Sequence, residues 1–99
     1  MSFSVNKAEI THDKIMKEMF SSNPLIRMRG ISHAAWINDT SADCRERLEL
    51  LKSDGSYDTL TKISVSDLAY AALDVLKFEH YSGDKALVKN LISCGLNCE

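Results

Sequence analysis

The sequence predicts an all-α fold, and three observations lead to that class. Four glycines and one proline in 99 residues favour long regular elements over tight turns. Apolar residues recur at spacings of three and four along most of the chain, which is the period of a helix. No alternating run of apolar and polar residues is long enough to predict a strand. A chain of this length makes one domain, so residues 1–99 are expected to form a single helical domain.

The most apolar segment, residues 23–37, is predicted to be the central helix. Asn23 can cap its first turn, and Pro24 fits the first helical position, where no N–H is needed. One apolar stripe repeats at spacings of four, four and three, at Ile26, Gly30, Ala34 and Ile37. Further apolar residues widen this stripe, namely Leu25, Met28, Ile31, Ala35 and Trp36. The residues expected to face solvent are few, namely Arg27, Arg29 and Ser32, so the helix needs neighbours on two sides.

Four further helices are expected around the central one. The first begins after Asn6, or at Thr11, and ends near Phe20. The third covers residues 42–52, is capped by Thr40 or Ser41, and has an apolar face at Cys44, Leu48 and Leu51, with Leu50 beside it. Residues 53–59 are rich in turn-forming residues and make the longest flexible stretch. The fourth helix covers residues 65–78 with Ser64 as its cap, and the last covers residues 84–93.

The second and fourth helices repeat one pattern at an offset of 39 residues. The stripe of the central helix aligns with Val65, Ala69, Leu73 and Leu76. In both copies a small residue follows four places after a β-branched one, where two helices can approach closely. A period near 40 with two helices in each unit is typical of helical repeats.

On these residues the chain resembles the HEAT family of helical repeats. Such repeats carry an acidic residue or Asn, then Pro, Val-Arg, a small residue and an Ala-Leu pair. The matching residues are Asn23-Pro24, Ile26-Arg27, Gly30 and Ala34 in the first copy, and Val65, Ala69 and Ala72-Leu73 in the second. Ser66 stands in place of the Arg, and Lys62-Ile63 in place of Asn-Pro. The resemblance spans about residues 13–93 and implies a short HEAT-like α-helical repeat; a compact five-helix bundle is the alternative.

Composition and charge indicate which classes of partner and which cellular compartment to expect. A net charge of −2 gives no general attraction to nucleic acid or to an anionic membrane. The N-terminus has no apolar core of signal-peptide length, and no run approaches the roughly 20 apolar residues of a membrane span. Three cysteines without the spacing of a disulfide scaffold suit a reducing compartment. A cytoplasmic protein is therefore expected.

No pattern predicts catalysis or metal binding. The chain has no glycine-rich phosphate loop, nucleophile elbow or paired-carboxylate motif. His33 lies among apolar neighbours and is expected in the core or at its boundary, while His12 is expected at a solvated helix start. Cys44, Cys94 and Cys98 lack the usual spacing of zinc ligands. We therefore expect no enzyme, no cofactor and no metal.

Acidic residues gather in the middle of the chain, where residues 38–60 carry six acidic and three basic side chains. Glu46 and Glu49 share one face of the third helix, and Tyr57 lies among carboxylates in the loop that follows. In helical repeats the second helices of successive units line one surface, which here means the third and fifth helices. The candidate partner-binding residues are Arg45, Glu46, Glu49, Asp54, Tyr57, Asp58, Lys85 and Lys89. A solvated helix face with a polar loop is the alternative interpretation.

These features predict a non-enzymatic protein-binding module. A small cytoplasmic chain without catalytic groups can act by occlusion, as an inhibitor or as the immunity protein of a bacterial toxin. The acidic patch would suit a cationic partner such as a nuclease. One alternative is a small HEAT-like nucleic-acid-binding protein, which would use Lys7, Lys14, Lys17, Arg27 and Arg29. The other is a structural subunit of a larger assembly, since a stack of about two units can require self-association or a partner at its ends.

Overall fold

The computed structural model describes residues 9–59, 62–81 and 83. This part of the chain is compact and mostly helical, in agreement with the predicted fold class. The elements, in chain order, are α1 (His12–Met19), α2 (Pro24–Trp36), α3 (Ala42–Leu51), β1 (Tyr57–Asp58), β2 (Ile63–Ser64) and α4 (Val65–Val75). The helix expected over residues 84–93 lies outside the described residues, as does Asn6.

Each helix begins after a side chain that caps its first turn. The four caps are Thr11, Asn23, Ser41 and Ser64, and each side-chain oxygen accepts a hydrogen bond from a backbone N–H two or three residues further on. Of the two starts expected for the first helix the structure has the one at Thr11, and of the two caps expected for α3 it has Ser41. Local capping therefore fixes where the helices begin.

The structure contains a short β-hairpin, so the expectation of no strand is wrong. Tyr57 pairs with Ser64 and Asp58 with Ile63 in an antiparallel ladder. A further backbone bond of 2.8 Å, from the Val65 N–H to the Ser56 carbonyl, extends the pairing into the start of α4. Strands of two residues are too short to show alternation, which is why the sequence pattern does not reveal them.

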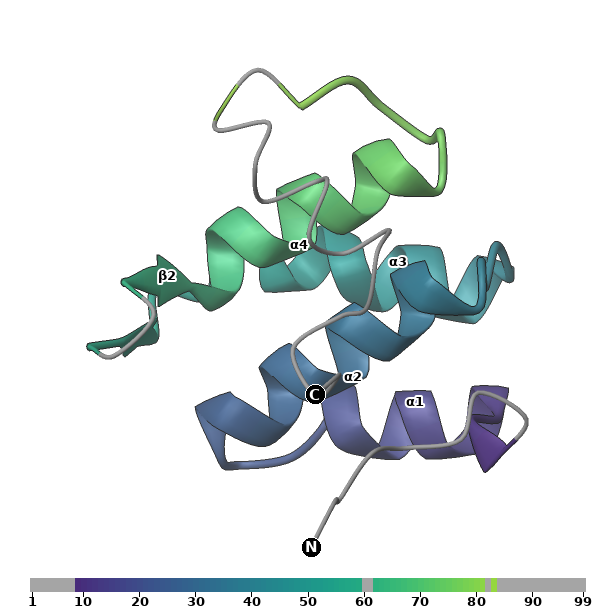
Figure 1. Cartoon of the computed structure of the whole chain (residues 1–99), viewed down its shortest axis with the longest axis horizontal. Coiled ribbons are helices and arrows are strands. Elements are labelled where there is room, and N and C mark those ends of the chain that lie inside the picture. Colours follow the sequence, from purple (N-terminus) through teal and green to yellow (C-terminus); the bar gives the residue numbers. More distant parts are fainter. Residues whose placement is uncertain (1–8, 60–61, 82, 84–99) are drawn as a thin grey trace, which may run out of the picture.

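The helices form two antiparallel pairs in contact with each other. α1 packs against α2, and α3 packs against α4, while α2 and α4 contact each other between the two pairs. Figure 1 shows α1, α2 and α4 one above another, with α3 beside α4 and the hairpin at one end of the molecule. The two most apolar helices, α2 and α4, thus contact each other, and each has a second helix packed against it.

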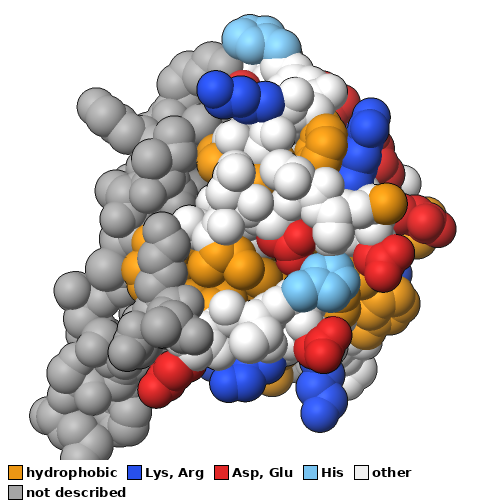
Figure 2. All heavy atoms as spheres, turned by 90° about the vertical axis from the view of Figure 1, so that its right-hand side faces the viewer, with side chains coloured by type: hydrophobic (Ala, Val, Ile, Leu, Met, Phe, Trp, Pro, Cys, Tyr) orange, Lys and Arg blue, Asp and Glu red, His pale blue; other side chains and the backbone are white. Residues whose placement is uncertain are grey.

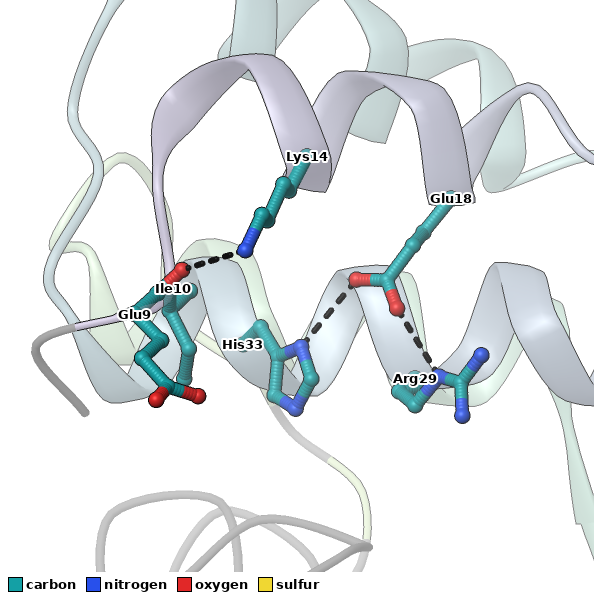
Figure 3. Close-up of a pocket in the computed structure, with 6 residues that line it drawn as sticks. All are labelled: Glu9, Ile10, Lys14, Glu18, Arg29 and His33. Carbon is teal, nitrogen blue, oxygen red and sulfur yellow. Dashed lines mark hydrogen bonds and ion pairs between the residues drawn. The ribbon is translucent and has the colours of Figure 1, made fainter. Parts of the chain in front are cut away.

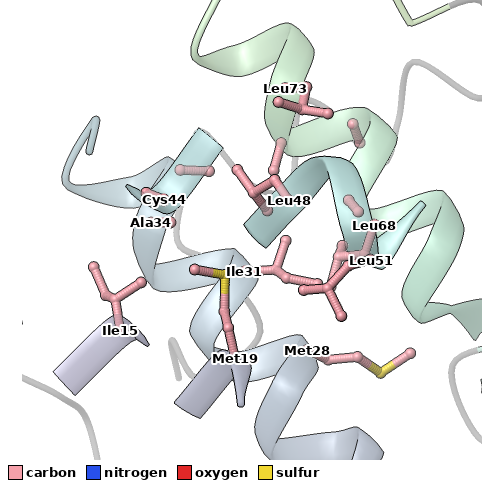
Figure 4. Packing of buried hydrophobic residues seen from close by; sticks show 14 of the residues in the cluster. Ile15, Met19, Met28, Ile31, Ala34, Cys44, Leu48, Leu51, Leu68 and Leu73 are labelled. Carbon is pink, nitrogen blue, oxygen red and sulfur yellow. The ribbon is translucent and has the colours of Figure 1, made fainter. Parts of the chain in front are cut away.

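One continuous cluster of apolar side chains joins the four helices (Figure 4). Its largest fully buried members are Ile15, Met19, Met28, Ile31, Leu48, Leu68 and Leu73. The predicted stripe of α4 is buried throughout, at Val65, Ala69, Leu73 and Leu76. In α2 the middle of the stripe is buried, at Gly30 and Ala34, but Ile26 and Ile37 at its ends are only half-buried.

Three residues of α2 face differently from the prediction: Ser32, Leu25 and Arg27, whose side chain is only 14% exposed. Ser32 is fully buried instead of facing water, and its hydroxyl donates a hydrogen bond of 3.0 Å to the Met28 carbonyl. This bond within the helix satisfies the hydroxyl, so the small side chain can enter the core. Leu25, expected to widen the apolar stripe, is 57% exposed in the first turn.

Candidate functional site

The outer surfaces of α1 and α3 enclose a groove of about 210 Å³, which we call the α1–α3 groove. The residues that line it are Met16, Phe20, Asp43, Glu46, Arg47 and Leu50. The two helices run in the same direction, because His12 and Asp43 meet where both begin, while Met19 and Arg47 meet near their other ends. Side chains from both helices can therefore contact one ligand along the length of the groove.

The floor of the groove at its C-terminal end is apolar and exposed to solvent. Phe20 is 62% exposed and Leu50 is 60% exposed, although both are large hydrophobic residues. Met16 lies one helical turn before Phe20 and is half-buried. Exposed apolar side chains gathered in a concave site are typical of an interaction surface, whereas single ones scattered over a surface need no explanation.

Arg47 holds the two walls of the groove together. Its Nε and Nη2 atoms donate to the Met19 carbonyl at 3.2 and 3.0 Å, at the C-terminal end of α1 where a cation is favoured. Its guanidinium carbon also lies 4.1 Å from the centre of the Phe20 ring. Arg47 therefore positions Phe20, and two of its donors are used within the chain.

Carboxylates form the other end of the groove. The Asp43 side chain is 76% exposed, and Glu46, one turn before Leu50, is also exposed. Among the described residues neither side chain has an ion-pair partner closer than the 3.9 Å between Asp43 Oδ2 and His12 Nε2. Figure 2 shows acidic side chains around a histidine on the face where α1 and α3 begin. The groove thus combines an apolar end with an acidic end.

His12 links the start of α1 to the turn before α3. Its Nδ1 atom lies 2.7 Å from Asp39 Oδ2 and 3.2 Å from the Ser41 hydroxyl. The hydrogen bond with Asp39 raises the pKa of His12 above its ordinary value, because it outweighs the opposing effect of burial. Burial favours the neutral form of Asp39, but hydrogen bonds from His12 and Ser41 outweigh it and lower the pKa of that carboxyl. Asp39 and Ser41 contact the same ring nitrogen, which is not the arrangement of a catalytic triad.

The predicted binding residues of α3 divide between two surfaces. Glu46 lines the α1–α3 groove. The Arg45 guanidinium lies 4.6 Å from the centre of the Phe78 ring, beyond the end of α4. Glu49 lies 2.5 Å from Lys52 Nζ, which also pairs with Glu79 at 2.8 Å. Only Glu46 of this group is therefore both exposed and placed in a concave site.

The predicted residues of the following loop do not form an open acidic patch. Asp54 Oδ2 lies 2.7 Å from Arg27 Nε, and these side chains are only 18% and 14% exposed, so the expectation of an exposed carboxylate here is corrected. Burial opposes ionisation of Asp54, but hydrogen bonds from Ser56 and Arg27 lower its pKa. Tyr57 is exposed on β1 and Asp58 is half-buried, both in the hairpin. Lys85 and Lys89 lie outside the described residues.

A second hollow, of about 180 Å³, lies between α1 and α2 (Figure 3). Its lining residues are Glu9, Ile10, Lys14, Glu18, Arg29 and His33. Glu18 accepts a hydrogen bond of 2.8 Å from Arg29 Nε and lies 3.1 Å from His33 Nδ1. His33 is buried, as the sequence predicts. The charged groups of this hollow join α1 to α2, so we assign it a structural role.

No family model, no curated protein and no solved structure matches the chain. In the part of the chain that the structure describes, no helix is long and apolar enough to cross a membrane, and no three metal-binding side chains are grouped as ligands. The candidate site therefore depends on the geometry of the α1–α3 groove.

Sequence reasoning identified one of the six groove residues, Glu46. The sequence places Leu50 beside the apolar face of the third helix and Phe20 at the end of the first helix, and it does not indicate that both are exposed in one groove. A signal was present for Leu50: it lies two positions from Leu48, on a different side of the helix from the buried face. A large apolar residue off the buried stripe could thus have pointed to this surface.

Proposed function

We propose that the chain is a non-enzymatic protein-binding module and that the α1–α3 groove receives its partner. The observation that carries this proposal is the exposure of Phe20 and Leu50 in one groove that also has carboxylates in its lining. Large apolar side chains in a concave site, with charged groups around them, have the composition of a protein interface.

The charge arrangement favours a protein over a nucleic acid. Two of the cations suggested for phosphate binding already have carboxylate partners, Arg27 with Asp54 and Arg29 with Glu18. The groove itself presents Asp43 and Glu46, which repel phosphates. A basic protein surface would instead be attracted, and its association would be faster at low salt.

The finer proposal is an inhibitor, such as the immunity protein of a bacterial toxin, that covers the active site of a cationic enzyme. It is supported by the acidic end of the groove, which would face the positive charge of such an enzyme. For the architecture we propose a short HEAT-like stack, supported by the contact between α2 and α4, the two helices that carry the repeated pattern. A five-helix bundle is the alternative architecture, and both leave the α1–α3 groove in place.

Affinity capture with groove variants tests this function. The tagged chain would be expressed in the cells that produce it naturally, as wild type and as the double variant Phe20→Ala/Leu50→Ala. We expect the wild type to retain a specific protein and the double variant to bind that protein at least tenfold more weakly. Leu25→Ala is the matched control, because Leu25 is equally exposed but lies outside the groove. Capture of no protein, or equal capture by all three chains, would contradict the proposal.

A further inference from the structure

We propose that the segment bound in the α1–α3 groove is a basic amphipathic helix of the partner. One large apolar residue of this helix would lie between Phe20 and Leu50, and a Lys or Arg one turn away would face Asp43 and Glu46. This inference rests on the proposed function, since it specifies the partner segment for the same site.

The walls of the groove favour a helix over an extended segment. Both walls are α-helices, whose backbone N–H and C=O groups are bonded within each helix. They offer no row of free backbone groups, whereas an extended peptide usually binds by adding a strand to a sheet edge. A helix satisfies its own backbone groups and needs only side-chain contacts from the groove.

The spacing of the lining residues matches one face of a helix. Glu46 and Leu50 are four residues apart on α3, so the acidic and apolar ends are separated by about one turn, or roughly 6 Å. On a helix lying along the groove, an apolar residue and a cation four positions apart have the same separation. The volume of about 210 Å³ leaves room for a side chain of the partner, while its backbone would lie above the groove.

The charge expected on the partner is positive, because the cation of the groove is engaged within the chain while its carboxylates are exposed. Among the described residues that line the groove, Arg47 is the one cation, and it is engaged by the Met19 carbonyl and the Phe20 ring. In the described part of the groove lining, the exposed charges that remain for a partner are Asp43 and Glu46. Like charges placed opposite each other in an interface are strongly unfavourable, so an acidic helix should be rejected.

A titration with two designed peptides tests the proposal. Both peptides would be hydrocarbon-stapled helices of about 14 residues, long enough for some four turns. The basic one carries a Leu with Lys residues on the same face, and the acidic one carries Glu in place of each Lys. Each would be added to the isotope-labelled full chain and followed by nuclear magnetic resonance. We expect the basic peptide to shift the resonances of Phe20, Glu46 and Leu50, and to bind at least tenfold more tightly than the acidic one.

Charge reversal in the groove provides the deciding variant. Asp43→Lys/Glu46→Lys should reverse the preference, so that the acidic peptide binds more tightly than the basic one. The control Glu9→Lys/Asp67→Lys makes the same change in net charge at exposed positions outside the groove and should keep the wild-type preference. Equal binding of both peptides, shifts centred elsewhere, or reversal in the control as well would overturn the proposal.

The peptide and capture experiments together distinguish an error in the basic-helix assignment from an error in the proposed function. If the natural partner depends on Phe20 and Leu50 but neither peptide binds, the basic-helix assignment is wrong while the protein-binding function stands. If the peptides bind as expected but no cellular protein is captured, the groove has the inferred preference and the proposed function is contradicted.

Discussion

Gly30 lies where α2 comes closest to α1, and Gly30→Ala tests how tightly these helices pack. A Cβ atom at this position would lie 2.8 Å from Glu18 Cβ and 2.9 Å from both Cγ and the backbone N of Met19. Ordinary contacts between carbon atoms are about 3.5–4.0 Å, so α1 would have to move. Met19 N belongs to the backbone and cannot be relieved by rotating a side chain.

Two effects of opposite sign determine how much Gly30→Ala changes the free energy of unfolding. Replacing a glycine by alanine inside a helix stabilises the helix by about 1 kcal/mol. Forcing an extra carbon into a closely packed core usually costs about 1–3 kcal/mol, and contact with backbone favours the upper part of that range. We therefore expect Gly30→Ala to lower the free energy of unfolding by about 1–2 kcal/mol, or the melting temperature by roughly 5–15 °C.

Thermal unfolding followed by circular dichroism measures this effect, with Gly55→Ala as the matched control. A Cβ atom at Gly55 would meet no atom within 4 Å, and the Gly55 backbone is not left-handed. The control should therefore leave the melting temperature unchanged or raise it slightly, because alanine reduces the freedom of the unfolded chain. A melting temperature for Gly30→Ala at or above that of the wild type would refute the close packing of α1 on α2.

Three further predictions concern the core, the ion pair at the start of α1, and the buried thiol. Leu73→Ala should lower the free energy of unfolding by about 2–5 kcal/mol, because Leu73 is fully buried. Ile26→Ala should lower it clearly less, because Ile26 is only half-buried. Equal losses in chemical unfolding would contradict this difference in burial. The pKa of His12 is raised above 6.5 in the folded state, so its contribution to stability is complete below about pH 6.5 and is lost as pH rises through the folded pKa. The gap in stability between wild type and His12→Asn should thus narrow from about pH 6 to about pH 8, and a constant gap would argue against the contact with Asp39. Burial raises the pKa of Cys44 to about 12, so in a variant without the other two cysteines this thiol should react with a thiol reagent only after unfolding, and rapid labelling of the folded chain would contradict its burial.

Local signals in the sequence predict much of the helical framework. Asn23 and Ser64 cap helices where the sequence places them, because a cap depends only on a few neighbouring residues. The stripe of α4 is buried as predicted, since eight of the eleven residues of that helix are apolar. Gly30 was recognised as a point of close approach, and the structure identifies α1 as the helix that approaches it.

The features that the sequence did not reveal depend on contacts between distant residues. Asp54 was expected at the surface, but an Arg on α2, 27 positions earlier, holds it in an ion pair. The exposure of Phe20 and Leu50 likewise follows from how α1 and α3 lie against each other. Helical periodicity identifies which residues share a face of one helix, but it does not determine which faces of two helices remain open.

The central claim is that the α1–α3 groove binds a protein, and hydrogen–deuterium exchange with the captured partner tests it most directly. Exchange would be compared between the free chain and the complex, with both at the same pH and temperature. We expect the amides of α1 and α3 near the groove, above all those around Phe20 and Leu50, to gain protection in the complex. Protection confined to the hairpin or to α4, with exchange at the groove unchanged, would contradict the claim.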